Sequence, residues 1–313
     1  MEDKNSKRGY LNDDFKIFII NDKKDMEFEY HHHDFNKIII FLDGDVTYYI
    51  EGKQYQLQPS DILFISNTEI HKPVINPNVS YSRIAIWVNP DYLKKFNTRN
   101  NNLNKCFEKT KDDKQYLLSL NDMNINVLNN FIAQIQTAGD DEEFGSDILR
   151  SSLFLQMMVF LNRSLLSSDY NSRDIEYDNT VENMLNFIEE NIDGDLSIDT
   201  LSTKFYISKY YLMRKFKAQT GTSIHNYIVQ KRLLMAKHLI REGHLMNDVC
   251  NMCGFNDYSS FVRAFKKAYG VSPKNYKTKS NLFGDIDTTN ELKNYYNLKN
   301  NYWQLKCKII KYY

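Results

Sequence analysis

Three consecutive histidines, His31, His32 and His33, are the first residues of this 313-residue chain whose types and spacing could do chemistry. Side chains two residues apart on a strand point to the same side, so His31 and His33 should lie together and His32 should point away. His71 follows at the end of a later strand-like run. Imidazoles bind transition metals and also line polar pockets, so this trio raises the question of a metal.

The spacing resembles the metal motif of the cupin barrels, in which HxH is followed shortly by a glutamate and later by a third histidine. His31, His33 and His71 match that motif, but Lys37 stands where the glutamate would be. A cation there opposes a divalent metal and removes an oxygen ligand. We therefore expect no catalytic metal and no cofactor.

Residues 15–88 support a barrel, because short β-rich runs alternate with turn signals at Gly44, Gly52 and Pro59. This pattern predicts a sandwich or small barrel. Two interpretations of its interior stay open: a small-molecule pocket, in which Lys37 pairs with an anionic group, or a barrel filled by its own side chains. The effector-binding residues expected by resemblance are His31, His33, Lys37, Tyr49, His71 and Trp87.

A second set of candidate residues lies in a repeat. "RKFKAQTGTSIHNY" at 214–227 returns as "RAFKKAYGVSPKNY" at 263–276, with seven identical pairs in a register of 49 residues. Upstream the register is 48, which indicates one inserted residue in a turn, where insertions are tolerated. Each copy predicts two short helices joined by a tight turn, at about 198–205 and 209–219, then 246–253 and 258–268.

Cap signals define these helices. Ser208, and Asn256 or Asp257, are suitable N-caps, and Gly221 and Gly270 are suitable left-handed residues just past the helix ends. Ser223 and Ser272 would then cap the next helices, with Pro273 at the first helical position. The helix between the two copies is long and amphipathic, and it would fix the distance between them.

A helical wheel separates two faces of the second helix in each copy. Leu212 and Phe216, like Phe261 and Phe265, share one apolar face and should form the core. The opposite faces carry arginine and lysine. Residues 196–280 hold 15 basic and 4 acidic side chains, a net charge of +11, which the rest of the chain balances at −11. A solvated basic face would need no partner, but two matched stripes on a basic segment favour a polyanion such as DNA.

These residues, with the stretch "NDVCNMCGFNDYSSFVRAFKKAYGVSPKNY", resemble the DNA-binding domain of the AraC/XylS family of transcriptional regulators. The resemblance covers roughly residues 180–280 and implies two helix-turn-helix units that read adjacent segments of the major groove. It implies that DNA is contacted by Lys209, Tyr210, Met213, Arg214, Lys217, Tyr258, Ser259, Val262, Arg263 and Lys266. Cys250 and Cys253 are then interpreted as buried structural residues instead of zinc ligands.

The expected fold is α+β and multidomain. A cupin-like effector-binding β-barrel at 10–100 is followed by a helical dimerisation region at 120–168 and a linker at 169–180. An all-α DNA-binding domain with two helix-turn-helix units occupies 181–280, and a tail without an assigned role occupies 281–313. An antiparallel helix pair is expected between residues 124 and 167, either buried against the barrel or forming a dimer seam.

The predicted function is a cytoplasmic, sequence-specific transcriptional regulator that responds to a small-molecule effector such as a sugar. We expect a homodimer that binds double-stranded DNA, with RNA polymerase as a further partner, no membrane association and no enzymatic activity. The alternative is a metal-dependent cupin enzyme fused to a DNA-binding module.

Overall fold

The computed structural model describes residues 11, 13–22, 28, 30–140, 143–167 and 179–282. The chain forms two units, residues 1–278 and 279–313, and the contacts reported below lie within the first. The predicted linker at 169–180, except for its last two residues, lies outside the described residues. So does the predicted tail beyond Leu282, together with Cys307.

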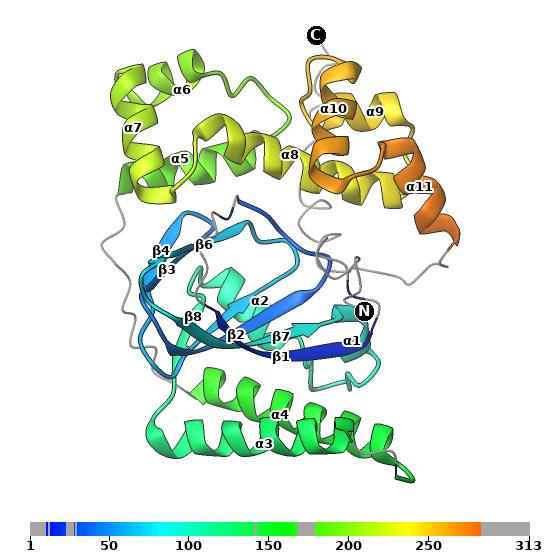
Figure 1. The fold of residues 1–313 in the computed structure, drawn as a ribbon. Helices are drawn as coiled ribbons and strands as arrows, with labels where there is room; N and C mark the ends of the chain where they lie inside the picture. Colours follow the sequence, from blue (N-terminus) through cyan, green and yellow to red (C-terminus); the bar gives the residue numbers. More distant parts are fainter. Residues whose placement is uncertain are drawn as a thin grey trace. The chain divides into compact units, whose positions relative to one another are not determined.

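Eight strands of the described residues form two antiparallel sheets. Five strands make one sheet in the order β1-β7-β2-β5-β8, and three make the other in the order β4-β3-β6 (Figure 1). The strands are β1 (Phe15–Asp22), β2 (Asn36–Asp43), β3 (Val46–Ile50), β4 (Lys53–Gln56), β5 (Asp61–Ile65), β6 (His71–Ile75), β7 (Tyr81–Val88) and β8 (Leu117–Ser119).

Both faces of the five-stranded sheet contribute to an apolar core. On β2, Ile38 and Ile40 enter a core shared with the helices that cover the sheet, and Ile39 and Phe41 enter the core that faces the three-stranded sheet. Successive side chains of a strand point to opposite faces, so both sets must be apolar for the strand to be buried. This explains why the sequence of β2 reads as a continuous apolar run.

Four of the described helices contribute to the core that the five-stranded sheet shares with the helices covering it. They are α1 (Pro90–Lys94), α2 (Lys105–Asp112), α3 (Asp122–Asp140) and α4 (Ser146–Ser167). The last two lie side by side along the five-stranded sheet (Figure 1), and Phe154 of α4 stacks on Phe15 of β1 with ring centroids 3.8 Å apart. The helix pair expected between residues 124 and 167 is confirmed, and α4 is buried against the barrel along one face.

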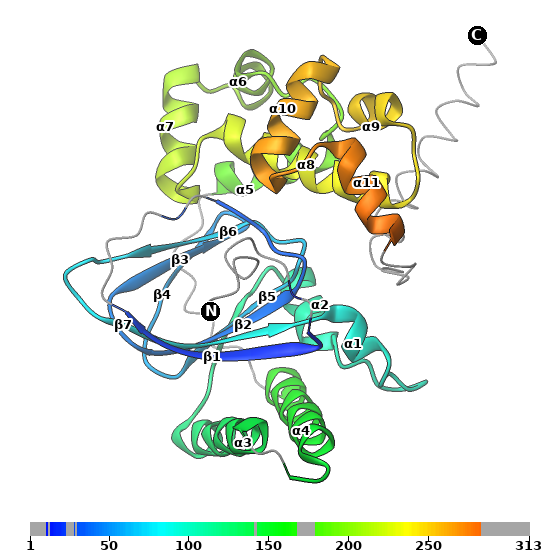
Figure 2. The ribbon, with the colours of Figure 1, turned by 45° about the vertical axis from the view of Figure 1, so that its right-hand side comes forward.

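Among the described residues, seven helices form the C-terminal domain, and they are labelled α5 to α11 in Figure 2. They are α5 (Asn179–Glu190), α6 (Ile198–Phe205), α7 (Lys209–Thr220), α8 (Ile224–Arg241), α9 (Met246–Met252), α10 (Tyr258–Tyr269) and α11 (Pro273–Leu282). The pairs α6–α7 and α9–α10 are the two predicted helix-turn-helix units, and both pack against the long helix α8.

The predicted caps are confirmed. Ser208 accepts a hydrogen bond from the backbone N–H of Tyr211 at the start of α7, and Asp257 accepts one from Ser260 at the start of α10. Gly221 and Gly270 follow these helices with φ of 75° and 73°. That left-handed conformation is costly for residues with a Cβ atom, which explains why glycine stands at both positions.

The structure differs from the sequence-based expectation in three places. Helices α1 and α2 and strands β6 and β8 were not predicted. His33 lies in the segment before β2 and not on a strand, and His31 makes only an isolated bridge to His71. His71 begins a strand, β6, and does not end one.

Cys250 and Cys253 are buried, as predicted for structural residues, and burial raises the pKa of both thiols. Among the described residues, no helix is both long enough and apolar enough to span a lipid bilayer.

Candidate functional site

The second helix of each helix-turn-helix unit is anchored by two side chains. Leu212 and Phe216 of α7, and Phe261 and Phe265 of α10, are fully buried. Each contributes about 1.5–3 kcal/mol of favourable free energy by leaving water. The prediction that these four residues form the core is confirmed, so the opposite side of each helix faces outward.

The outward face of α7 is cationic and aromatic. Tyr210 is 72% exposed, and the guanidinium of Arg214 lies 6.0 Å from its ring. Lys209 forms an ion pair with Asp199 of α6. All five residues of α7 that we expect to contact DNA are exposed: Lys209, Tyr210, Met213, Arg214 and Lys217.

The outward face of α10 is cationic but smaller. Ser259, Arg263 and Lys266 are exposed, and Val262 is half-buried. Tyr258 is exposed but also packs its ring edge-on against Phe261, with centroids 6.0 Å apart, so it supports the core as well. Arg263 is held loosely by a 3.3 Å hydrogen bond that it donates to Ser260.

Helix α8 joins the two units as one continuous rod. Its 18 residues correspond to about 27 Å at 1.5 Å per residue, of the same order as the ~34 Å between successive major grooves on one face of DNA. Buried residues at both ends, among them Ile224 and Ile240, pack it into the domain. The structure therefore provides two exposed cationic helices joined by one continuous helix, which is a geometry that suits two adjacent segments of the major groove.

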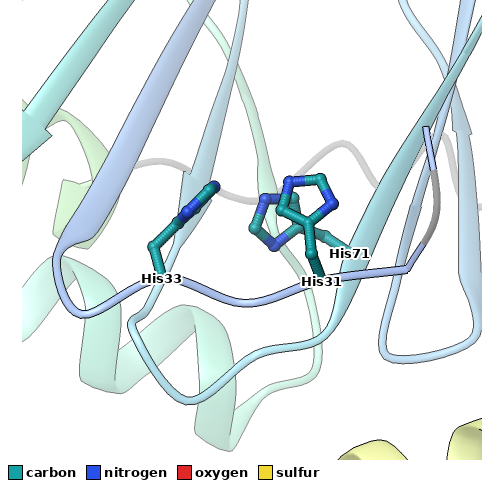
Figure 3. A group of neighbouring side chains, drawn as sticks. All are labelled: His31, His33 and His71. Atoms are coloured by element: carbon teal, nitrogen blue, oxygen red, sulfur yellow. The ribbon is translucent and has the colours of Figure 1, made fainter. Parts of the chain in front are cut away.

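A second candidate site lies in the barrel, where three histidines meet (Figure 3). The backbones of His31 and His71 exchange two hydrogen bonds, with N···O distances of 3.2 and 3.0 Å. The ring centroids of His31 and His33 are 4.8 Å apart, and those of His33 and His71 are 5.1 Å apart. One ring nitrogen from each histidine lies within 4.8 Å of the other two.

The environment keeps the rings of His33 and His71 neutral. Burial, followed by the positive charge of Lys37 and the neighbouring histidines, holds the pKa of His33 well below its usual value. Burial, His31 and Lys37 do the same for His71. The Nδ1 atom of His71 lies 3.1 Å from the carbonyl oxygen of Glu69, which assigns the proton to Nδ1 and leaves Nε2 as a bare acceptor.

Two cationic side chains share the barrel interior with the histidines. Lys37 lies on the same face of β2 as Ile39, and Trp87 lies opposite it on β7. Burial, together with the charge of Arg83, lowers the pKa of Lys37 to about 8. Arg83 shares the inward face of β7 with Ala85 and Trp87. Sequence reasoning missed Arg83, although its alternation with Ile84 and Ile86 in "SRIAIWV" is the signal that would have found it.

Tyr49 is the effector-site candidate that the structure does not bring to this group. On β3, Val46, Tyr48 and Ile50 point into the core, so Tyr49 points outward. Its ring lies against Gly221, at the turn between α7 and α8. Of the six candidates, the structure brings together His31, His33, Lys37, His71 and Trp87.

The barrel also makes polar contacts with the helical domain that the sequence did not indicate. Glu51, in the turn after β3, accepts a 2.8 Å hydrogen bond from Tyr227 and pairs with Lys231 at 2.7 Å. Lys231 also pairs with Glu189 at 2.8 Å. Burial alone would lower the pKa of Lys231, but the two carboxylates outweigh it and raise the pKa.

Two residues between and after the histidines contact the same domain. The Nε2 atom of His32 lies 3.0 Å from the hydroxyl of Tyr269, and Asp34 forms an ion pair with the buried Lys237 of α8. A cavity of about 1050 Å³ adjoins these contacts, and its walls include residues 30–34, Lys217 and Arg263.

Comparisons with known proteins agree with this architecture. The model of the AraC-like ligand binding domain matches residues 17–158, and the model of a helix-turn-helix domain matches residues 201–279. The first includes both sheets and most of the α3–α4 pair, and the second includes both helix-turn-helix units.

The similarity to known relatives extends over most of the chain. The HTH-type transcriptional activator RhaS of Citrobacter koseri is 25% identical over 253 residues, which is 80% of this chain and 87% of the relative. RhaS of Escherichia coli is 23% identical over 254 residues, 80% of this chain and 88% of the relative. The solved C-terminal domain of the two-component response regulator yesN from Fusobacterium nucleatum is 32% identical and covers 32% of this chain and 99% of that one, with a TM-score of 0.31. The chain thus combines an AraC-like ligand-binding domain with two helix-turn-helix units, and it belongs to the AraC/XylS family of DNA-binding transcriptional regulators.

Proposed function

We propose that this regulator binds a small anionic effector inside its barrel and that the bound effector changes how the protein binds DNA. The observation that carries the proposal is the pair of cationic side chains, Lys37 and Arg83, on the inward faces of β2 and β7. No carboxylate among the described residues forms an ion pair with Lys37. A buried cation without a partner carboxylate costs free energy, which an anionic ligand recovers.

The histidines and Trp87 refine the choice of effector. Neutral imidazoles exchange hydrogen bonds with hydroxyl groups, and an indole ring provides a flat apolar surface for a sugar ring. Within the sugars expected from the sequence, a sugar acid or sugar phosphate fits these groups better than a neutral sugar does.

A thermal-shift and calorimetry screen of the full chain tests the effector. Neutral sugars, sugar acids and sugar phosphates are compared at equal concentration. We expect an anionic compound to bind, and Lys37→Met and Arg83→Met each to weaken it by at least about tenfold, since a charge-assisted hydrogen bond contributes about 1.5–3 kcal/mol. Lys16→Met on β1, where the lysine pairs with Asp13, is the control. Binding unchanged in both interior variants would refute the site.

We also propose that the protein dimerises through the outer face of α3 and α4. Large apolar side chains are exposed there although the opposite face of the pair is buried. They are Met123, Val127, Ile148, Leu149, Val159 and Leu166. An exposed apolar stripe of this kind favours a second copy of the same chain. Light scattering should show a dimer that becomes monomeric in Leu149→Asp, whereas Lys105→Asp on α2 should leave the mass unchanged.

The remaining parts of the proposed function follow from DNA binding. We propose that the protein acts in the cytoplasm, where the DNA is, and that it activates transcription, because the relative RhaS is named a transcriptional activator. We also propose that RNA polymerase is a partner. We propose that it has no enzymatic activity. The alternative, a metal-dependent cupin enzyme fused to a DNA-binding module, requires turnover of a substrate by the metal-loaded protein.

A further inference from the structure

Six of the seven identical pairs in the repeat have a role that the fold or the expected DNA contacts explain. The phenylalanines and tyrosines of the repeat are buried. Its glycines end one helix, and its serines cap the next. Its arginines and lysines lie on the exposed faces of α7 and α10. The seventh pair, Asn226 and Asn275, is left without an explanation.

Neither packing nor capping requires these two asparagines. Both side chains are exposed, and among the described residues neither side-chain amide has a hydrogen-bond partner. Only the backbone N–H groups are used, donating to the hydroxyl oxygens of Ser223 and Ser272 at 3.2 and 3.3 Å. Asparagine is also a poorer helix former than alanine, glutamate or glutamine. The side chains therefore point to a partner outside the chain.

The two asparagines occupy the same place in their units. The backbone N–H of Gly221 donates to the carbonyl oxygen of Lys217 at 2.9 Å, and Gly270 donates to Lys266 at 2.8 Å. The ring contact between the repeated phenylalanine and tyrosine also recurs, with centroids 5.7 Å apart in the first unit and 5.6 Å in the second. The chain thus follows the same path from the lysine to the asparagine in both units.

The first turns of the helices in this domain differ in charge. An acidic residue in the first turn stabilises a helix, and α5, α6 and α9 each have one: Glu182, Asp199 and Asp248. The other described helices of the domain, α7, α8, α10 and α11, have none. These four helices are the two that we expect to contact DNA and the two that directly follow them, so acids are missing where a phosphate would repel them.

The third residue of three helices shows the same contrast at one position. Asp248 is the third residue of α9, and Asn226 and Asn275 are the third residues of α8 and α11. An asparagine side chain has the shape of an aspartate but carries no negative charge, and it can donate a hydrogen bond. This exchange of acceptor for donor suits an anionic partner.

Asn226 also faces the same space as residues that we expect to contact DNA, because it lines the cavity whose walls include Lys217 and Arg263. In protein–DNA complexes, phosphate oxygens accept hydrogen bonds from asparagine as well as from lysine and arginine. We propose that Asn226 and Asn275 each donate a hydrogen bond from the side-chain amide to a DNA phosphate. The two matched contacts would hold the second helix of each unit in one orientation on the duplex.

Alanine substitutions in the full chain test the contact. The probes are a duplex enriched from a random library by the unaltered chain and a duplex of unrelated sequence. Asn226→Ala and Asn275→Ala should each weaken binding to both duplexes by about three- to tenfold, which corresponds to the loss of one hydrogen bond. Because the amide is neutral, the salt dependence of binding should stay unchanged, unlike that of Lys217→Ala.

Charged substitutions separate a phosphate contact from a structural role. Asn226→Asp should weaken binding more than Asn226→Ala does, because a carboxylate repels phosphate, and the additional loss should shrink as the salt concentration rises. Asn226→Lys should bind at least as tightly as the unaltered chain and steepen the salt slope by about one. Asn183→Asp is the matched control, because Asn183 is exposed on α5 beside the acidic Glu182, and it should leave binding unchanged.

Thermal denaturation of each variant is measured in parallel. Alanine and aspartate both suit the first turn of a helix, so the midpoints should not fall. Unchanged binding in both alanine variants overturns the proposal, and so does an equal loss in Asn183→Asp and Asn226→Asp. A loss confined to the enriched duplex overturns the phosphate contact in favour of a contact to a base.

Discussion

The two helix-turn-helix units share a framework but differ in the residues they present. Both second helices have a side-chain N-cap, two buried anchor residues and a left-handed glycine at the C-terminus. The exposed faces differ, since α7 presents Tyr210 and Met213 where α10 presents the smaller Ser259 and Val262. The comparison indicates that packing determines the buried anchors and the glycine that both copies share. The exposed faces share only the arginine and the lysine and differ at the neighbouring positions.

The turns of the two units also differ. Tyr206 ends α6 in the left-handed conformation, with φ of 55° and 95% exposure. In the second unit Gly254 takes the corresponding position with φ of 71°. A Cβ atom at Gly254 would lie 2.9 Å from the guanidinium of Arg232 and 2.9 Å from the carbonyl oxygen of Asp193. The first turn therefore tolerates a side chain and the second does not.

The largest expected effect comes from a substitution that tests this difference between the turns. Gly254→Ala should lower the free energy of unfolding by roughly 2–4 kcal/mol, because left-handed strain and overpacking both act. Gly243→Ala is the control: its φ is 90° but nothing lies within 4 Å, so it should cost about 1–2 kcal/mol. Urea denaturation of both variants measures the difference, and equal losses would show that the close contacts do not matter.

The next largest effect is expected from the arginines on the exposed faces of α7 and α10. Arg214→Ala and Arg263→Ala should each weaken binding to the specific site by about 1–3 kcal/mol, since each arginine can donate two hydrogen bonds to a guanine. Each variant should relax base preference at a different position of the target. Footprinting against a library of single-base changes measures the base preference at each position. If both variants altered the same position, the two helices would not contact separate bases.

A smaller effect is expected from the lysines at the shared repeat position. Lys217→Ala and Lys266→Ala should weaken binding evenly across sequences and reduce the salt slope by about one, because each removes one phosphate contact. Titrations at several salt concentrations measure the slope. Lys53→Ala on β4 serves as the control, and a loss confined to one DNA sequence would indicate base reading instead.

The smallest effect returns to the first turn. Tyr206→Gly should raise the free energy of unfolding by about 0.5 kcal/mol, because relief of left-handed strain slightly exceeds the entropy that glycine loses on folding. Thermal denaturation at matched concentrations would detect the change. A destabilised variant would mean that the exposed tyrosine makes contacts worth more than the strain.

The sequence by itself determined the helix boundaries and the buried residues of the two helix-turn-helix units. Its caps, left-handed glycines and apolar spacing act over a few residues, so the boundaries of α6, α7, α9 and α10 could be predicted to within about two residues. The burial of Phe216 and Phe265 followed from helical periodicity alone. Strands β1 to β5 and β7 could be predicted for the same reason, because β-rich runs and the turn residues between them are local signals.

Only the tertiary structure decided which distant residues meet. The pairing of His31 with His71 and that of Lys37 with Trp87 depend on strand registers that bring together residues far apart in the chain. The contacts of Glu51 and Asp34 with α8 depend on packing between domains. Local sequence patterns carry no information about these pairings, because they arise from the global arrangement that buries the most apolar surface.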